Sequence, residues 1–302
     1  MRAEFRLGET ASAVRPQELI VVGAGVVGMA TALTLADRGH RVTVVDRAEE
    51  AGRGTSFANG GQLSYSYTDA LASPATLAQF PRLLLARDPA FRFHPSLDAD
   101  FLRWTLAFLS NGSTGRFRRN TLEGLALAVQ SRTALHALTR RHRIDFAHST
   151  PGKIIIYRSA KSFAAARAIA ADKAVAGAEQ HFLDADGAIA AEPMLASIRS
   201  AIVGAIHTPS EEVGDPYRFC IGAQAALVAG GTDVRCGVAI ERIDASGKRP
   251  AIVAADGTRL SADRIILCAG TGSAALARAI GVSLPILPMK GHSITAAPGS
   301  AA

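Results

Sequence analysis

Cysteine is scarce in this 302-residue chain, and its three copies show no pairing pattern. Cys220, Cys236 and Cys268 form no CxxC unit and no metal-ligand spacing. A sparse, odd count argues against the disulfide framework of a small secreted protein and favours a reducing compartment. The polar start, MRAEFRLGETASAVRPQE, lacks the apolar core of a signal peptide, so we predict a cytoplasmic protein.

The chain also lacks repeats and the composition of a disordered protein. Hydrophobic residues make up 48% and charged residues 20%, so a sizeable core is expected. Basic residues exceed acidic ones by 33 to 26, a net charge of +7. No RNP, zinc-finger or helix-turn-helix pattern accompanies this charge, so we predict no nucleic-acid partner. The charge is compatible with peripheral contact to the anionic inner face of the cytoplasmic membrane.

One run approaches the length of a membrane span. Leu19–Ala36 (LIVVGAGVVGMATALTLA) contains no charged residue. Its internal glycines would interrupt a spanning helix early, and no basic loop asymmetry flanks it. The run is therefore predicted to be a buried strand, a tight turn and a helix.

The turn carries the pattern G-x-G-x-x-G at Gly23, Gly25 and Gly28. A β-branched strand, Leu19–Val22, precedes it, and a helix over Val26–Arg38 follows. In such a unit the glycines permit a sharp turn, close approach of a pyrophosphate and tight packing of helix on strand. The helix N-terminus offers unpaired N–H groups to the phosphates. This context favours a dinucleotide site, with a tight turn that binds no ligand as the alternative.

A second predicted strand, Arg41–Asp46, ends in an acid. The carboxylate of Asp46 is placed to accept hydrogen bonds from ribose hydroxyls, and it disfavours the 2′-phosphate of NADP. The pattern does not distinguish NAD from FAD.

A loop rich in small residues and side-chain donors follows this unit, and its composition suits either close approach to a large planar cofactor or an ordinary Gly/Ser loop. The run GTSFANGGQLS begins at Gly54 and resembles the small subunit of D-amino-acid dehydrogenases, within the D-amino-acid oxidase-like family of FAD enzymes. Three later segments fit this family in the same order: TPSEEVGDPY (Thr208–Tyr217), ADRIILCAG (Ala262–Gly270) and LPMKGHS (Leu287–Ser293). The resemblance covers about residues 18–295.

The resemblance implies an α/β fold in which a Rossmann-like FAD-binding domain is interleaved with an α+β substrate domain. We expect a polar extension over 1–17, the FAD domain over 18–73 and 205–280, and the substrate domain over 74–204 and 281–302. Family members continue beyond the position that matches Ala302. The substrate domain is therefore expected to lack its C-terminal part, as a fragment or a truncated chain would, which leaves flavin retention and activity open.

Sequence patterns predict the remaining elements. Helices are expected within 74–143, with helical spacing clearest over 121–138, and over 163–178 and 215–228. Strands are expected over 152–157, 201–207, 234–243 with a kink at Gly237, and 264–268, with a β pair over 251–260.

The resemblance also suggests site residues. Those expected to contact FAD are Gly23, Ala24, Gly25, Val26, Val27, Gly28, Asp46, Arg47, Thr55, Ser56, Asn59, Gly61, Gln62, Val238, Ala269 and Gly270. Val238 is expected beside the adenine, through its backbone, or else is simply part of a strand. Lys290 is the catalytic candidate near the flavin, where a cation would stabilise negative charge, or else is a surface lysine.

Substrate-binding candidates are Tyr65, Tyr67 and His292, although aromatic residues after a loop often simply pack. The histidines show no HxxxH or HExxH spacing, so no metal site is predicted.

The implied reaction is FAD-dependent oxidative deamination of D-amino acids such as D-alanine. A hydride passes to flavin N5, the imine hydrolyses to a 2-oxo acid and ammonia, and electrons pass to a quinone chain. The alternatives are a glycine or sarcosine-type amine oxidase that uses oxygen, and an inactive truncated fragment. An NAD-dependent dehydrogenase would leave the GTSFANGGQ and LPMKGHS segments without a role.

Overall fold

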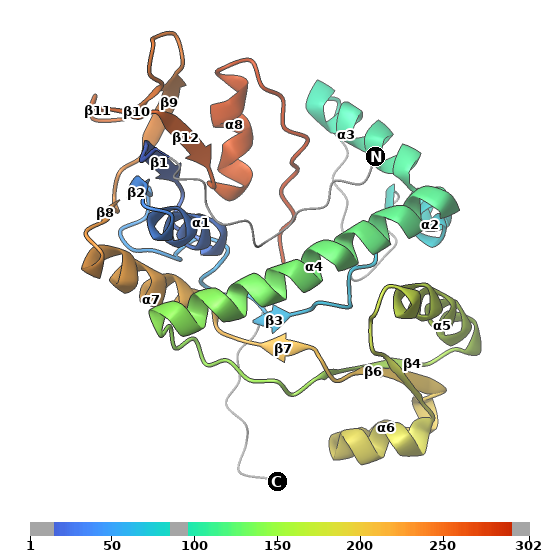
Figure 1. Ribbon diagram of the computed structural model, residues 1–302. Helices are drawn as coiled ribbons and strands as arrows, with labels where there is room; N and C mark the ends of the chain where they lie inside the picture. The colour runs from blue at the N-terminus through green and yellow to red at the C-terminus, as the bar shows by residue number, and fades with distance from the viewer. Residues whose placement is uncertain (1–14, 85–95, 292–302) are drawn as a thin grey trace. The chain divides into compact units, whose positions relative to one another are not determined.

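The computed structural model describes residues 15–84 and 96–291, and the chain forms two compact units (Figure 1). One unit consists of Met1–Ala58 and Pro216–Leu284, and the other of Asn59–Asp215 and Pro285–Ala302. Both units are therefore discontinuous in sequence. Strand β3 (Gln62–Leu63) pairs with β7 (Glu212–Val213), and both strands belong to the second unit.

The first unit is built on a four-stranded parallel sheet with the strand order β12-β1-β2-β8. Its strands are β1 (Glu18–Val22), β2 (Arg41–Val45), β8 (Asp233–Arg235) and β12 (Arg264–Leu267). The strand order reverses at β1, because β2 lies on one side of it and β12 on the other. Open α/β sheets bind ligands at such a reversal, beyond the carboxyl ends of the strands. The predicted α/β, Rossmann-like class is confirmed.

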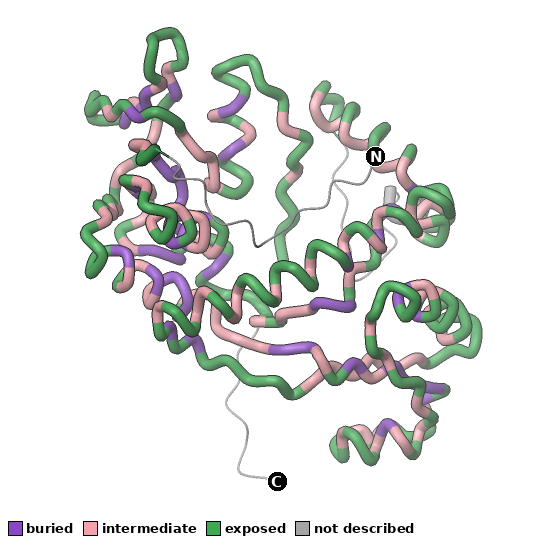
Figure 2. Tube along the Cα trace, viewed as in Figure 1, coloured by how far each residue is buried: buried purple, intermediate pink, exposed green. Residues whose placement is uncertain are grey.

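The two central strands of this sheet, β1 and β2, are largely buried, as Figure 2 shows, whereas the edge strands β8 and β12 are more exposed. Helices α1 (Val26–Asp37) and α7 (Pro216–Ala229) pack against each other, and α1 also packs on β1 and β2. On the other face, Ile20, Val22 and Val45 form one cluster with the antiparallel sheet β11-β10-β9. Because strand side chains alternate between faces, Val21 and Val44 point toward the helices, and both are fully buried.

The antiparallel sheet corrects one prediction. The stretch 234–243 is not one kinked strand but two strands in two sheets, since β8 belongs to the parallel sheet and β9 (Ile240–Asp244) pairs with β10 (Ala251–Ala254). Gly237 lies between them with a φ of +77°. Strand β11 (Arg259–Ser261) completes this sheet, and the chain ends the unit with η2 (Gly270–Gly272) and α8 (Ser273–Arg278).

The second unit is mainly helical. Its helices are α2 (Pro74–Leu84), α3 (Ala99–Asn111), α4 (Thr114–His142), α5 (Ala160–Val175), α6 (Ala185–Ala191) and the 3-10 helix η1 (Pro193–Ala201). The side chain of Asp98 caps α3 and that of Ser159 caps α5, as short polar residues do at helix starts. Among the described residues, no helix combines the length and apolarity needed to cross a bilayer.

A three-stranded antiparallel sheet, β4-β6-β5, packs against α5 and α6. Its strands are β4 (Lys153–Tyr157), β5 (His181–Leu183) and β6 (Gly204–Thr208). Ala188 of α6 and Ala205 of β6 form a small buried cluster with Ile202. The pair β3–β7 forms a separate short ribbon. Glu212 of this ribbon contacts the side chains of Tyr65, Arg132, His136 and His148.

Candidate functional site

The glycine turn lies where β1 and β12 end. Gly23 has a φ of +112°, and a Cβ on this residue would lie 2.4 Å from the Cys268 carbonyl oxygen at the end of β12. A Cβ on Gly28 would lie 1.8 Å from the Gly23 carbonyl oxygen. Both positions therefore require glycine, because any side chain would push the helix from the turn. The turn delivers α1 with Gly25 as its N-cap, and that residue provides no side-chain cap.

Because Gly25 has no side chain, it cannot cap the first N–H groups of α1, which therefore face the turn. The first turn of any helix has N–H groups without intrahelical partners, and its dipole favours negative charge. Here the Val26 N–H donates to the Ser56 hydroxyl at 3.2 Å, and Ser56 is buried. The side chain of Val27 is 64% exposed on the same turn, an apolar surface for a ligand to cover.

Asp46 follows β2 and closes the other side of the turn. Its carboxylate accepts from the Ala24 N–H at 2.6 Å and from the Ala48 N–H at 2.8 Å. These two backbone donors fix the carboxylate beside the glycine turn. Each carboxylate oxygen has two lone pairs, so both can also accept from a ribose hydroxyl.

The other residues predicted from the first unit lie around this turn. The Val238 N–H donates to the Asp46 carbonyl at 2.9 Å, so its backbone is adjacent to the acid. Ala269 follows β12, and its nitrogen lies 2.9 Å from the Cβ position of Gly23. Gly270 begins η2. Arg47 and Thr55 are exposed.

The first part of the GTSFANGGQ loop is held by aromatic packing. Phe57 meets Tyr217 of α7 edge-on at 5.1 Å between ring centroids. The Arg53 guanidinium lies over both rings, 4.7 Å and 5.3 Å from their centroids. This packing places Ser56, the residue before Phe57, at the start of α1.

The second part of that loop belongs to the other unit. Asn59 Oδ1 accepts from the Gly61 N–H at 2.8 Å, and the Gly61 carbonyl accepts from the Gly214 N–H at 2.8 Å. Gln62 Oε1 accepts from Lys153 Nζ at 2.9 Å. These contacts join the loop to β4 and to the residue after β7.

The substrate candidates have separate environments. Tyr65 is buried and its hydroxyl donates to Glu212 Oε2 at 3.1 Å, so only the lone pairs of its oxygen would remain for a substrate. Tyr67 is exposed, with the Lys153 ammonium 4.3 Å from its ring centroid. Lys290 is exposed. His292 lies outside the described residues.

A cluster around Glu212 escaped the sequence analysis. Glu212 is fully buried, and its Oε1 accepts from Arg132 Nε at 2.9 Å. Its Oε2 meets the Nε2 atoms of His136 at 2.9 Å and His148 at 2.8 Å. Burial alone would raise the pKa of Glu212, but the hydrogen bonds from His136, His148 and Arg132 lower it to about 2. Burial and the adjacent Glu212 carboxylate raise the pKa of Tyr65.

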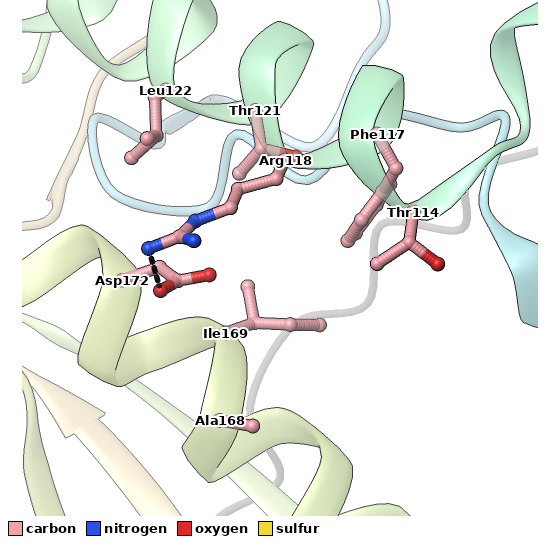
Figure 3. Close-up of a pocket in the computed structure, with 8 residues that line it drawn as sticks. All are labelled: Thr114, Phe117, Arg118, Thr121, Leu122, Ala168, Ile169 and Asp172. Atoms are coloured by element: carbon pink, nitrogen blue, oxygen red, sulfur yellow. Dashed lines mark ion pairs between the residues drawn. The ribbon is translucent and has the colours of Figure 1, made fainter.

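A cavity of about 250 Å³ lies between α4 and α5 (Figure 3). It is lined by Thr114, Phe117, Arg118, Thr121, Leu122, Ala168, Ile169 and Asp172. An ion pair of 2.6 Å joins Arg118 and Asp172 across it. The lining includes none of the residues predicted to bind a cofactor or substrate, and its two charges neutralise each other.

Comparison with protein families decides the identity of the fold. The family model described as "FAD dependent oxidoreductase" (DAO) matches residues 18–302. The chain belongs to the FAD-dependent oxidoreductase family of the DAO type. The glycine turn, the Asp46 carboxylate and the Ser56 loop all lie within the matched residues.

Curated relatives narrow the similarity within the DAO family. The chain is 42% identical over 280 residues to D-amino acid dehydrogenase 2 of Ralstonia nicotianae, covering 92% of this chain and 66% of that protein. It is 37% identical to a D-amino acid dehydrogenase of Dechloromonas aromatica, covering 92% and 68%. The chain therefore spans about two thirds of the length of these relatives.

Solved structures agree on the fold. Glycine oxidase from Geobacillus kaustophilus has a TM-score of 0.66 at 20% identity, covering 90% of this chain and 60% of that one. L-α-glycerophosphate oxidase from Mycoplasma pneumoniae, solved with FAD bound, has a TM-score of 0.56 at 16% identity, covering 88% and 57%.

The residues of the first unit fit FAD. The side-chain-free cradle at Gly23, the first turn of α1 and the fixed carboxylate of Asp46 would provide, in order, room for the diphosphate, N–H donors for it and an acceptor for a ribose. FAD is the cofactor that this DAO-family domain takes.

Proposed function

We propose that this chain is the FAD-binding and partial substrate region of a D-amino acid dehydrogenase, which deaminates D-amino acids oxidatively to 2-oxo acids and ammonia. The 42% identity to D-amino acid dehydrogenase 2, together with the intact glycine turn and Asp46, carries this proposal. We further propose that electrons pass on to a quinone-linked acceptor, with peripheral contact to the inner face of the cytoplasmic membrane.

The bound flavin would supply the two-electron oxidation of the substrate. The protein's own residues bind and orient. Gly25 and Val27 would donate backbone N–H groups to the diphosphate, next to Val26, whose N–H donates to Ser56, while Asp46 would accept from the ribose. An adenine amino group would meet the Val238 carbonyl, because the Val238 N–H is bonded to Asp46.

For the outer part of the cofactor we propose Arg47, Thr55 and the turn at Ala269 and Gly270. In the second unit, Asn59, Gly61 and Gln62 remain our proposed flavin contacts, and Tyr67, Lys290 and His292 our proposed residues near flavin and substrate. The reacting α-amine must be neutral when hydride leaves Cα, and this step needs no protein base, so no catalytic triad is assigned.

The test is a visible spectrum of the purified chain with added FAD, before and after anaerobic D-alanine. Bound flavin that bleaches with D-alanine but not with L-alanine supports the proposal. Reoxidation by a soluble quinone with little peroxide supports the acceptor. L-alanine at the same concentration is the matched control for non-specific reduction.

Other outcomes identify other functions. Bleaching by glycine or sarcosine with one peroxide per turnover would point to an amine oxidase. A colourless protein that takes up no FAD would contradict the proposal for a chain of this length.

A further inference from the structure

Three potential metal ligands converge in the second unit, apart from the residues proposed for FAD. The His136 Nε2, His148 Nε2 and Glu212 carboxylate oxygen all lie within 4.8 Å of one another. The two Nε2 atoms approach the same oxygen, Glu212 Oε2, at 2.9 Å and 2.8 Å. Two imidazoles and one carboxylate form a ligand set that zinc uses in sites with an open position.

The chain holds these ligands from three different elements. His136 lies on α4, Glu212 on β7 and His148 in the loop between α4 and β4. Next to His148, Ser149 exchanges two backbone hydrogen bonds with Val213, at 3.0 Å and 2.9 Å. This bridge fixes the loop beside Glu212, so the ligands are positioned before any ion arrives.

Aromatic contacts fix the two rings further. Phe146 stacks on His148 with 5.2 Å between centroids, and His136 meets His148 edge-on at 5.6 Å. Ring orientation matters because an imidazole can bind a metal only in the plane of its ring, along the nitrogen lone pair.

The carboxylate is also oriented. Arg132 Nε binds Glu212 Oε1, which leaves Oε2 facing the histidines. A partner that holds a ligating group in this way typically tunes metal affinity 10–100-fold. Tyr65 also donates to Oε2, at 3.1 Å.

The local charge favours a cation. Glu211, next to Glu212, is also buried, and its Oε2 has no hydrogen-bond partner among the described residues. The nearby buried Lys173 is already paired with Asp69. A buried carboxylate oxygen without a partner is costly, and a cation close to it reduces that cost.

A small ion can reach the cluster. The side chains of His136 and His148 are 28% and 31% exposed, whereas that of Glu212 is fully buried. The open position of the ligand set therefore lies on the histidine side, where water can complete the coordination.

We propose that His136, His148 and Glu212 form a binding site for a single zinc ion, which joins α4, β7 and the loop before β4. On zinc binding, the hydrogen bond from each imidazole Nε2 to Glu212 is lost. Each ring then carries its proton on Nδ1 and coordinates zinc through the Nε2 lone pair. Water occupies the remaining position. The argument for this site does not depend on the proposed flavin chemistry.

The experiment is a zinc titration of the full chain after chelator treatment, against a competing chromophoric chelator. We expect one zinc per chain. His136→Gln and His148→Gln each keep a hydrogen-bond donor for Glu212 but remove a ligand, so each should weaken zinc binding more than about 100-fold, beyond the loss of a supporting partner. His181→Gln is the matched control, because His181 also contacts a glutamate, Glu179, at 2.9 Å.

A second measurement uses only the unaltered chain, so it does not depend on folding of a variant. Diethyl pyrocarbonate modifies accessible histidines, and mass spectrometry maps the modified positions. Zinc should protect His136 and His148 and leave His181 reactive. Absence of zinc uptake, uptake that both glutamine variants retain, or unprotected His136 and His148 would each show that the cluster is only a hydrogen-bond network. No flavin enters either measurement, so failure of the proposed function leaves this result unaffected.

Discussion

The polar sites of the two units consist of different chemical groups, mainly backbone in one and side chains in the other. At the glycine turn of the first unit, the groups are backbone N–H donors, missing side chains and one carboxylate, all within residues 23–56. In the second unit, the side chains of residues 65, 132, 136 and 148 surround the buried carboxylate of Glu212. A site made of backbone depends on local conformation, whereas a site made of side chains depends on long-range packing.

Among the substitutions that test this comparison, Gly23→Ala should have the largest effect on stability and FAD binding. Its Cβ would lie 2.4 Å from the Cys268 carbonyl oxygen at a φ of +112°, so strain and overpacking should together destabilise the first unit by roughly 3 kcal/mol and abolish FAD binding. Chemical denaturation and flavin content measure both effects. Gly115→Ala on α4 is the control, because its Cβ meets nothing within 4 Å and both properties should stay near wild type. Undiminished flavin in Gly23→Ala would show that the turn is not the cradle.

Glu212→Gln tests the side-chain site. Loss of charge-assisted hydrogen bonds at a buried position should lower the free energy of unfolding by about 3 kcal/mol, measured in the presence of a chelator. Glu179→Gln removes an exposed partner of His181 and should change stability by less than about 1 kcal/mol. Equal effects of the two changes would contradict the importance of burial.

Acid should act on the same carboxylate. The folded pKa of Glu212, about 2, lies below the ordinary value of 4.5, so its contribution is present above pH 4.5 and is lost as the pH falls toward 2. The lost stability should be about 3 kcal/mol for a shift of this size. Denaturation between pH 6 and pH 3 should therefore be less pH-dependent in Glu212→Gln than in the wild type, and identical slopes would refute the assignment.

Asp46→Asn tests the one carboxylate at the glycine turn of the first unit. The amide can replace only one of the two acceptor oxygens that bind Ala24 and Ala48, and it loses the charge that would meet a ribose. FAD affinity should fall roughly 10–100-fold, the value of a hydrogen bond to a charged group. Fluorescence titration with FAD measures this change, with Asp37→Asn, at the last residue of α1, as the control.

Tyr65→Phe should have the smallest effect. It removes one hydrogen bond to Glu212, which corresponds to about 1 kcal/mol of stability. Tyr67→Phe, at an exposed ring, should be silent in the same thermal unfolding assay. A larger effect at Tyr67 than at Tyr65 would reverse the environments described for them.

These contrasts explain what the sequence could predict. The β1–α1–β2 unit was predictable because the glycine spacing, the β-branched strands and Asp46 are local signals within about 30 residues. The split between β8 and β9 was not, because Gly237 marks a kink in either arrangement and only pairing with β10 decides it. The cluster at Glu212 has no local signal at all. His136 and Glu212 are 76 residues apart, and their meeting depends on how α4 packs against β7.

The parallel sheet has a consequence for synthesis of the chain. Strand β1 pairs on one side with β2, which follows within about 20 residues, and on the other with β12, in the register Val22 to Leu267. At a translation rate of about 5–20 residues per second, the first strand waits roughly 12–50 s for its second neighbour. During that interval the segment Asn59–Asp215, the larger part of the second unit, leaves the ribosome, whereas the remainder of that unit, Pro285–Ala302, follows β12. The edge of β1 is thus still unpaired while the second unit is being synthesised, so chaperone capture is expected to act on β1.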